Sequence, residues 1–378
     1  MNVRDSEVIA GLLKQAGYAL TESAEHADAV IFNTCSVRQH AEDKVWSEIG
    51  RLTKSSRAQR KSAAGKKPKQ KPLVGLVGCM AQNYKEAVFE RSPAVDFVVG
   101  PADIAKIPAI LERLFSARKQ SGGSSLYEVK VWETDAESRP EEIYHTGYRQ
   151  DPEQAYVVIS EGCSNMCAYC VVPFVRGALR NRPYKEIVRE IKEAAAGGRR
   201  KITLLGQNVN AYRGDEGDFV ALLRTVAQLK GVDELSFITS HPRDTTVEIF
   251  RVMAEYANIK PYLHLPFQAG SNAVLKRMNR GYTREYYLDL ARQYRKLVPG
   301  GALSTDIIVG FPGETQEDFQ QTVDLVRDVE FESAYIFKYS PRPHSEAYAW
   351  ADTVEQAEKE RRHALILDLQ KTISRRKK

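Results

Sequence analysis

Residues 155–170 read AYVVISEGCSNMCAYC, a short apolar strand followed at once by three cysteines in a CxxxCxxC spacing. The three are Cys163, Cys167 and Cys170. Thiolates hold iron-sulfur clusters, and a 4Fe-4S cube takes about four ligands. Three grouped cysteines therefore predict a cube with one iron left open for a substrate or cofactor. The alternatives are a zinc knuckle and buried, inert cysteines, but zinc sites usually add a second cysteine pair or histidines, and none lies nearby.

The chain after Tyr156 alternates apolar runs of strand length with amphipathic runs of helical length. This alternation is typical of repeated β/α units around a parallel sheet. Six units predict a partial, open barrel rather than a closed eight-fold one. The cysteine loop follows the first strand, and barrel active sites lie at the C-terminal ends of the strands, so the chemistry is expected there. We expect strands at 155–160, 201–207, 234–240, 261–267, 303–311 and 333–340, separated by helices at 184–196, 219–229, 245–256, 283–297 and 315–329.

Polar residues and glycines at the ends of the other strands would face the same mouth of the barrel. Each alone is a weak signal, because turn residues and strand-end Asn are common, and convergence on one edge makes them candidates. The run GFPGET also opens a helix, and a helix N-terminus favours anionic groups. His264 could equally be a packed strand histidine or a functional one. The candidates are Gly206, Gln207, Asn208, Asn210, Ser240, His241, Gln268, Asp306, Gly310, Gly313 and Glu314.

Residues 1–120 predict a separate α/β domain. The expected elements are a helix from Asp5 to Ala16, a strand at 27–34, a helix to Leu52 and a strand at 73–78. Cys35 and Cys79 come just after the two strands, which suits a ligand site at the carboxyl edge of a parallel sheet. Structural burial of two such cysteines is the alternative. Residues 121–150 are expected to be a linker and residues 151–378 the barrel domain with a C-terminal helix.

The composition of the 378-residue chain limits its class and its partners. Lys and Arg exceed Asp and Glu by 55 to 49, a net charge of +6, and residues 51–71 contain no acidic residue. This stretch could be a flexible, solvated loop or a basic arm that contacts nucleic-acid phosphates. Apolar runs fall short of the ~18 residues of a membrane span, and the N-terminus is polar, so we expect a cytoplasmic protein without a membrane contact. Five cysteines, an odd number, favour metal binding or catalysis over disulfides.

Longer motifs resemble the radical S-adenosylmethionine methylthiotransferases, most closely the MiaB branch, which acts on tRNA. The matching runs cover nearly the whole chain apart from the basic stretch. They are NTCSVRQHAEDKVWSEIGRL, GCSNMCAYCVVPFVRG, LLGQNVNAY, HLPFQAGSNAVLKRMNRGYTREYY and STDIIVGFPGETQEDF. The resemblance implies an N-terminal Rossmann-like methylthiotransferase domain followed by a partial (β/α)6 radical S-adenosylmethionine barrel.

The resemblance also implies a reaction and its cofactors. Cys163, Cys167 and Cys170 would hold the 4Fe-4S cluster that cleaves S-adenosylmethionine, with Tyr169 beside the cofactor adenine. We expect Gly206, Gln207, Asn208, Gln268, Asp306, Gly310 and Glu314 to complete the cofactor site. A methylthio group would be placed on C2 of N6-isopentenyl adenosine next to the tRNA anticodon. The purine C2–H bond is not open to acid or base catalysis, which is why a radical is needed. Siblings of the family act instead on threonylcarbamoyl adenosine in tRNA or on a ribosomal protein.

The partners implied are tRNA, a reductant such as a flavodoxin or ferredoxin, and a sulfur donor, with the enzyme itself a monomer. Sulfur would arrive through an auxiliary 4Fe-4S cluster on Cys35, Cys79 and a third cysteine. In relatives that cysteine ends a strand preceding the segment aligned with Met1, and a small RNA-binding β-barrel, the TRAM domain, follows the barrel. Here a charged helix from Val354 to Lys378 closes the chain. We therefore expect truncation at both ends, with unpaired groups beside the lost central strand. A truncated chain that cleaves the cofactor or binds RNA without sulfur transfer is the alternative.

Overall fold

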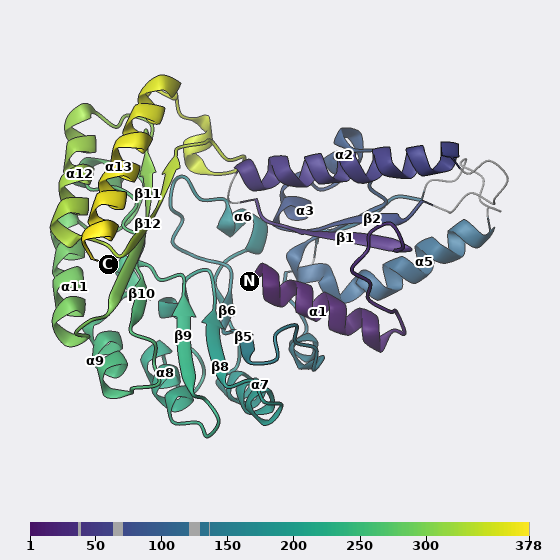
Figure 1. The fold of residues 1–378 in the computed structure, drawn as a ribbon, viewed down its shortest axis with the longest axis horizontal. Helices are drawn as coiled ribbons and strands as arrows, with labels where there is room; N and C mark the ends of the chain where they lie inside the picture. Colours follow the sequence, from purple (N-terminus) through teal and green to yellow (C-terminus); the bar gives the residue numbers. More distant parts are fainter. Residues whose placement is uncertain (37–38, 63–70, 121–128, 136, 378) are drawn as a thin grey trace. The chain divides into compact units, whose positions relative to one another are not determined.

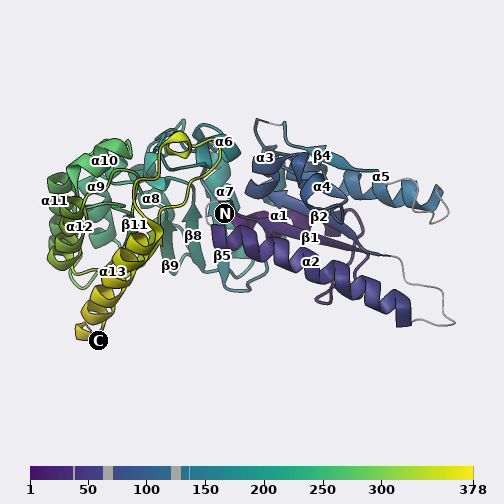
Figure 2. The same ribbon diagram turned by 90° about the horizontal axis from the view of Figure 1, so that it is seen from above.

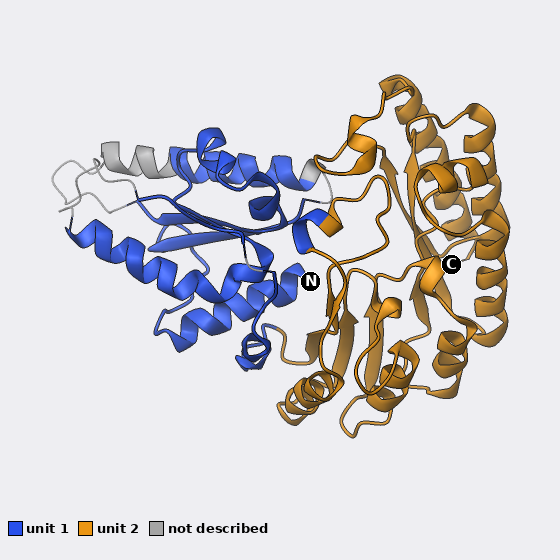
Figure 3. Cartoon of the chain, turned by 180° about the vertical axis from the view of Figure 1, so that it is seen from behind, with its two compact units in different colours: residues 1–150, 174–176 blue, residues 151–173, 177–378 orange. Residues whose placement is uncertain are grey.

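In the computed structural model the described residues are 1–36, 39–62, 71–120, 129–135 and 137–377, with backbone alone for 39–40 and 55–62. They fall into two compact units (Figure 3). The first unit comprises residues 1–150 together with 174–176, and the second comprises residues 151–173 and 177–378. Among the described helices, none combines the length and the apolar character that a membrane crossing requires.

The first unit is a parallel sheet between two layers of helices. The strands, in spatial order, are β1 (Ala29–Thr34), β2 (Leu73–Gly78), β3 (Phe97–Val99) and β4 (Val131–Glu133). Helices α1 (Asn2–Gln15) and α5 (Ile107–Gln120) lie on one face, and α2 (Gln39–Ser62), α3 (Cys79–Tyr84) and α4 (Ala87–Arg91) lie on the other (Figures 1 and 2). Alternation along β2 explains the layers, because Val74 and Leu76 join the core under α2, whereas Gly75 leaves room for the Phe97 ring on the opposite face.

Three details of this unit differ from the sequence prediction. Helix α2 continues to Ser62, so residues 51–62 of the expected basic loop are helical, while residues 63–70 lie outside the described part of the chain. Lys, Arg, Gln and Ala are good helix formers, and no Gly or Pro interrupts them there. The expected linker contributes β4, which pairs with β3, although residues 121–128 are not described. Finally, β1 and β2 pair directly along their whole length, so the open edges expected beside a lost strand do not occur between them.

The second unit is an open barrel of six parallel strands with helices outside (Figure 1). An isolated bridge from Leu235 to Ile259 links the two halves of the barrel. The strands are β5 (Gln154–Val158), β8 (Lys201–Leu205), β9 (Glu234–Ile238), β10 (Tyr262–His264), β11 (Ala302–Val309) and β12 (Ser333–Lys338). The helices are α7 (Tyr184–Ala196), α8 (Phe219–Ala227), α9 (Val247–Glu255), α10 (Asn272–Arg277), α11 (Arg284–Leu297), α12 (Gln316–Val329) and α13 (Gln356–Arg376). The predicted partial barrel is confirmed.

Side-chain alternation in β11 separates the two faces of this barrel. Leu303 and Ile307 belong to the apolar core beneath the outer helices. Ser304 and Asp306 therefore point to the opposite, inner face. His264 of β10 joins them there, because its Nδ1 lies 2.9 Å from Ser304 Oγ. The inner face consequently carries polar groups, as a ligand site requires.

Candidate metal and cofactor site

The cysteine loop is closed at its base by a short antiparallel ribbon. Strand β6 (Ser160–Glu161) pairs with β7 (Arg180–Asn181), and α6 (Val172–Arg176) lies between them in sequence. Gly162 begins the loop with φ +75°. A Cβ there would collide with the backbone oxygens of Gly177 and Ala178, just before β7. Within the loop the Cys170 N–H donates to the Cys167 carbonyl at 2.9 Å. The local fold thus places all three cysteines on one tight loop.

The three thiols lie close together; Cys167 is buried, and Cys163 and Cys170 are half-buried. Burial raises the pKa of Cys163, and the neighbouring Cys167 raises it further. Burial also raises the pKa of Cys170 to about 12, again with contributions from the other two thiols. Thiols whose pKa is raised in this way stay protonated at neutral pH unless a cation compensates the thiolate. The three thiols and their surroundings therefore fit a metal cluster whose binding displaces the thiol protons.

Cys167 is also approached by two nitrogen-bearing side chains. Arg280 Nη1 donates to Cys167 Sγ at 3.3 Å and to the Tyr169 hydroxyl at 3.2 Å. His241 Nε2 lies 3.9 Å from the same sulfur. Burial lowers the pKa of His241 to about 2, with the charges of Arg280 and Arg243 acting in the same direction, so this imidazole is neutral. The sequence prediction missed Arg280, because it follows a short helix rather than a barrel strand, although it lies within one of the runs that resemble the family.

The loops after β8 and β9 hold the cysteine loop in place. Gly206 allows close approach, since a Cβ there would lie 2.6 Å from Ser160 Oγ. Gln207 Oε1 accepts a hydrogen bond from the Gly162 N–H at 2.5 Å. Asn208 Nδ2 donates to Asp244 Oδ2 at 2.6 Å, and Asn165 of the cysteine loop donates to the same oxygen at 3.2 Å. The structure therefore brings Gly206, Gln207 and Asn208 to the cysteine loop, as their strand-end positions predicted.

Buried polar atoms without a hydrogen-bond partner gather at this end of the barrel. An unpaired buried donor or acceptor costs about 1–3 kcal/mol, so such atoms in a folded protein call for a ligand or water. Among the described residues the unpaired atoms of this region are Ser160 Oγ, Asn208 Oδ1, Ser240 Oγ, Gln268 Oε1 and Asp306 Oδ1. They come from five different strand ends or strands, and Gln268 holds a left-handed backbone with φ 68°. These residues fit a small polar cofactor placed over the cysteine loop.

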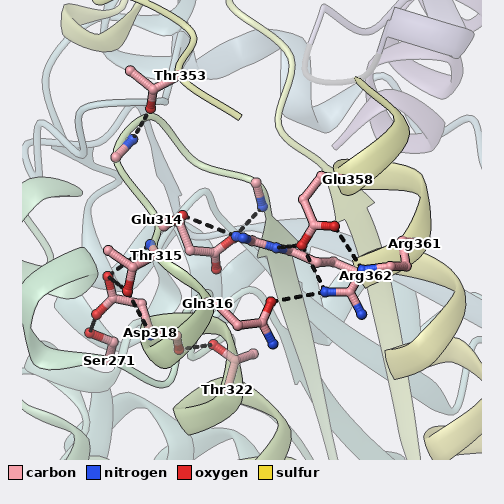
Figure 4. A network of polar contacts seen from close by, with 12 residues as sticks. Ser271, Glu314, Thr315, Gln316, Asp318, Thr322, Thr353, Glu358, Arg361 and Arg362 are labelled. Carbon is pink, nitrogen blue, oxygen red and sulfur yellow. Dashed lines mark hydrogen bonds and ion pairs between the residues drawn. The ribbon is translucent and has the colours of Figure 1, made fainter. Parts of the chain in front are cut away.

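Two expected cofactor residues, Gly310 and Glu314, contact the C-terminal helix α13. The Glu314 carboxylate is buried and accepts from Arg362 Nη1 of α13 at 2.7 Å and from the Gly310 N–H at 2.5 Å (Figure 4). A Cβ on Gly310, whose φ is +70°, would collide with the Lys359 side chain. Gly310 and Glu314 therefore tie the loop after β11 to the C-terminal helix. Only Oε2 of Glu314 is used in these contacts, and its buried Oε1 has no partner among the described residues, so Glu314 also stays a candidate for the cofactor.

The two cysteines of the first unit lie at the ends of adjacent strands. Thr34 and Gly78 are register partners, so Cys35 and Cys79 follow on neighbouring strands. Arg176 donates from Nε to Cys79 Sγ at 3.3 Å and from Nη2 to Asp5 at 2.8 Å. The described residues of this unit thus supply two thiols, fewer than the four ligands of a 4Fe-4S cube.

Comparison with known proteins finds a matching family model for each unit. A family model of the radical SAM superfamily matches residues 157–326, and a model of the uncharacterized protein family UPF0004 matches residues 1–100. The chain is 42% identical to a tRNA-2-methylthio-N(6)-dimethylallyladenosine synthase of Carboxydothermus hydrogenoformans, over 99% of this chain and 82% of the relative. The enzyme of the same name from Pelotomaculum thermopropionicum is 38% identical over 99% and 80%.

Solved structures share the fold at low sequence identity. The radical S-adenosylmethionine methyltransferase TsrM from Kitasatospora setae, with tryptophan and a SAM analogue bound, superposes with a TM-score of 0.52 at 15% identity, covering 91% of this chain and 72% of that one. The cobalamin-dependent radical enzyme OxsB, with S-adenosylmethionine bound, gives a TM-score of 0.51 at 13% identity over 98% and 50%. These likenesses concern the fold alone.

Proposed function

Because the chain belongs to the family of the tRNA-2-methylthio-N(6)-dimethylallyladenosine synthases, within the radical SAM superfamily, we propose that it attaches a methylthio group to C2 of N6-isopentenyl adenosine in tRNA. The observation that carries this assignment is the loop of three clustered thiols at the mouth of a six-stranded barrel, within a chain about 40% identical to such enzymes along nearly its whole length. The target nucleoside lies next to the anticodon, and the enzyme works in the cytoplasm.

Cys163, Cys167 and Cys170 would hold the 4Fe-4S cluster and leave one iron open for S-adenosylmethionine. When bound, the cluster and S-adenosylmethionine together supply a carbon radical able to act on the purine C2–H bond, which is not open to acid or base catalysis. The unpaired atoms of Asn208, Ser240, Gln268 and Asp306 would bind the polar groups of the cofactor. The Tyr169 ring would lie beside its adenine, and Gly206 would let the chain pass close by.

The tRNA base would be extruded from its stack toward the inner face of the barrel. Single-stranded loops such as the anticodon region are the usual targets of sequence-specific RNA recognition, because their bases can be splayed out. The chain bears a net charge of +6, which favours contact with phosphates. A flavodoxin or ferredoxin would supply electrons, and a separate donor would supply sulfur.

Cys35 and Cys79 would bind the auxiliary cluster through which the sulfur passes. Their adjacency at two strand ends and the guanidinium of Arg176 beside Cys79 support a metal site there. Two thiols leave that site short of ligands, and this observation favours a second candidate function, in which the chain cleaves S-adenosylmethionine without transferring sulfur.

Iron and sulfide per chain after anaerobic reconstitution separate these functions. Each 4Fe-4S cluster contributes about four irons, so about eight indicate both clusters and about four indicate the barrel cluster alone. The variant C163A/C167A/C170A should lose the roughly four irons of the barrel cluster, and C35A/C79A should lose only those of the auxiliary cluster. Methylthiolation is then followed by mass spectrometry on anticodon stem-loops that carry isopentenyl adenosine, threonylcarbamoyl adenosine or plain adenosine. A product on the threonylcarbamoyl substrate alone would overturn the assignment, and cofactor cleavage without any product would establish the second function.

A further inference from the structure

Arg280 is a buried cation whose guanidinium faces the thiol of Cys167. The residue is 3% exposed and belongs to the loop after α10. Beyond its contacts to Cys167 and Tyr169, its Nη2 donates to the Pro266 carbonyl at 2.9 Å and its Nε to the Tyr282 hydroxyl at 3.1 Å. All three nitrogens of the fork are engaged, so the side chain is held in one orientation, with Nη1 directed at the sulfur.

The charge of Arg280 has no carboxylate partner. Within the described residues no Asp or Glu oxygen lies within ion-pair distance of it, and its partners are a carbonyl, two phenols and a thiol. Other buried arginines of the same unit do have such partners, as Arg182 pairs with Glu190 at 2.6 Å and Arg362 with Glu314 at 2.7 Å. A buried, unpaired cation is costly, since its desolvation is not repaid. The missing negative charge must therefore come from a group that the site acquires.

The thiolate of Cys167 is the group that can supply it. Metal binding takes the proton off a cysteine and leaves a negatively charged sulfur, and cluster binding would place three such sulfurs in this loop. His241, the other nitrogen-bearing neighbour of Cys167, lies farther from the sulfur, at 3.9 Å against 3.3 Å for Arg280 Nη1.

We propose that Arg280 is a positioning residue that compensates the charge of the Cys167 thiolate and thereby makes reduction of the cluster at this loop easier. A fixed positive charge favours the more negative, reduced form of a nearby redox centre, and hydrogen bonds to cluster sulfurs act in the same direction. Loss of the charge should lower the equilibrium constant for one-electron reduction roughly tenfold or more, a shift of about 59 mV or more toward negative potential. Since this role rests on the proposed radical chemistry, its test uses the cluster itself and needs neither tRNA nor sulfur transfer.

The test compares midpoint potentials in the 378-residue chain. The background is C35A/C79A, so that only the barrel cluster is titrated, by anaerobic dye-mediated reduction followed by electron paramagnetic resonance. R280M removes the charge at similar length, R280K keeps a charge, and R284M is the matched control, because Arg284 pairs with Asp328 on the outside of the barrel at 3.2 Å. We expect a negative shift of about 59 mV or more for R280M, at least half of it restored in R280K, and no shift in R284M.

Other outcomes contradict or support the proposal. Equal potentials for R280M and the unsubstituted protein, at equal iron content, would overturn the proposal, and so would an R280K shift as large as that of R280M, because the charge would then be irrelevant. If R280M holds too little iron to titrate, R280K decides: full iron at the unaltered potential supports compensation of charge, and loss of iron in R280K as well refutes it. Failure to methylthiolate tRNA in proteins with unaltered potentials would count against the proposed function and leave this role intact.

Discussion

Replacing Arg362 by Met should destabilise the barrel unit by about 3 kcal/mol, because it removes one half of a buried ion pair. The side chains of Arg362 and Glu314 are 5% and 0% exposed, and their charged atoms lie 2.7 Å apart (Figure 4). The same guanidinium donates to the Glu314 carbonyl at 3.1 Å and to Glu358 at 2.7 Å. Breaking such a buried pair usually costs about 3–5 kcal/mol.

The expected value lies at the lower end of that range for a physical reason. Burial raises the pKa of Glu314 even with Arg362 present, so the abandoned carboxyl group can take up a proton instead of remaining an unpaired charge. The double variant E314Q/R362M removes both charges and should cost less than R362M alone. R361M is the matched control, since Arg361 is one residue away on α13, is half exposed and pairs with Glu358 at the surface, a contact worth about 1 kcal/mol or less.

Hydrogen exchange read by mass spectrometry measures this change, because it follows peptides of the barrel separately from those of the first unit. Protection in α12, α13 and β11 should fall by about 3 kcal/mol in R362M and by less than about 1 kcal/mol in R361M. Equal losses in the two variants would refute the role assigned to the buried pair. A double variant as damaged as R362M would show that packing, not an orphaned charge, sets the cost.

Three other perturbations have expected outcomes. Burial alone would raise the pKa of Glu332, but hydrogen bonds from Arg295 and Lys377 lower it to about 2, so its contribution to stability is complete above the unfolded pKa of 4.5 and is lost as the pH falls toward 2. The variant E332Q should therefore flatten the acid limb of the Tm profile between those values, and an unchanged limb would contradict this. D5N replaces a buried carboxylate, which accepts from Arg139 and Arg176, by a neutral amide. The loss of this charge should lower the exchange protection of the first unit by about 3–5 kcal/mol. T315A removes the capping box of α12 and should cost about 1 kcal/mol by urea unfolding, whereas a neutral result would show that this cap is redundant.

The elements of the barrel could be predicted because their sequence periods agree with their burial. The expected helix at 184–196 coincides with α7, whose inward residues Ile187 and Ile191 recur at the spacing of one helix face. The expected strands match because β11 alternates between core and inner face. The positions of Cys35 and Cys79 could be foreseen for the same reason, since parallel strands end at a common edge.

The partners of the buried arginines could not be predicted. Arg280 lies 113 residues from Cys167, Arg176 lies 97 residues from Cys79, and Arg362 lies 48 residues from Glu314. Periodicity and motif spacing carry information on neighbours within a few turns, whereas these contacts depend on how whole elements pack. An arginine on a helix or loop gives the same sequence signal whether it faces solvent or a thiol.

The same limit applies to the polar residues at the strand ends, as two asparagines after β8 demonstrate. Asn208 and Asn210 have the same chemistry and nearly the same position. Asn210 is saturated, because its Nδ2 donates to the His241 carbonyl at 2.9 Å and its Oδ1 accepts from the His241 N–H at 3.0 Å. It therefore ties β8 to β9. Asn208 uses only its Nδ2, and its buried Oδ1 has no partner among the described residues. Since a buried acceptor is costly without a donor, Asn208 is the one of the two that a cofactor should engage, and only the geometry separates them.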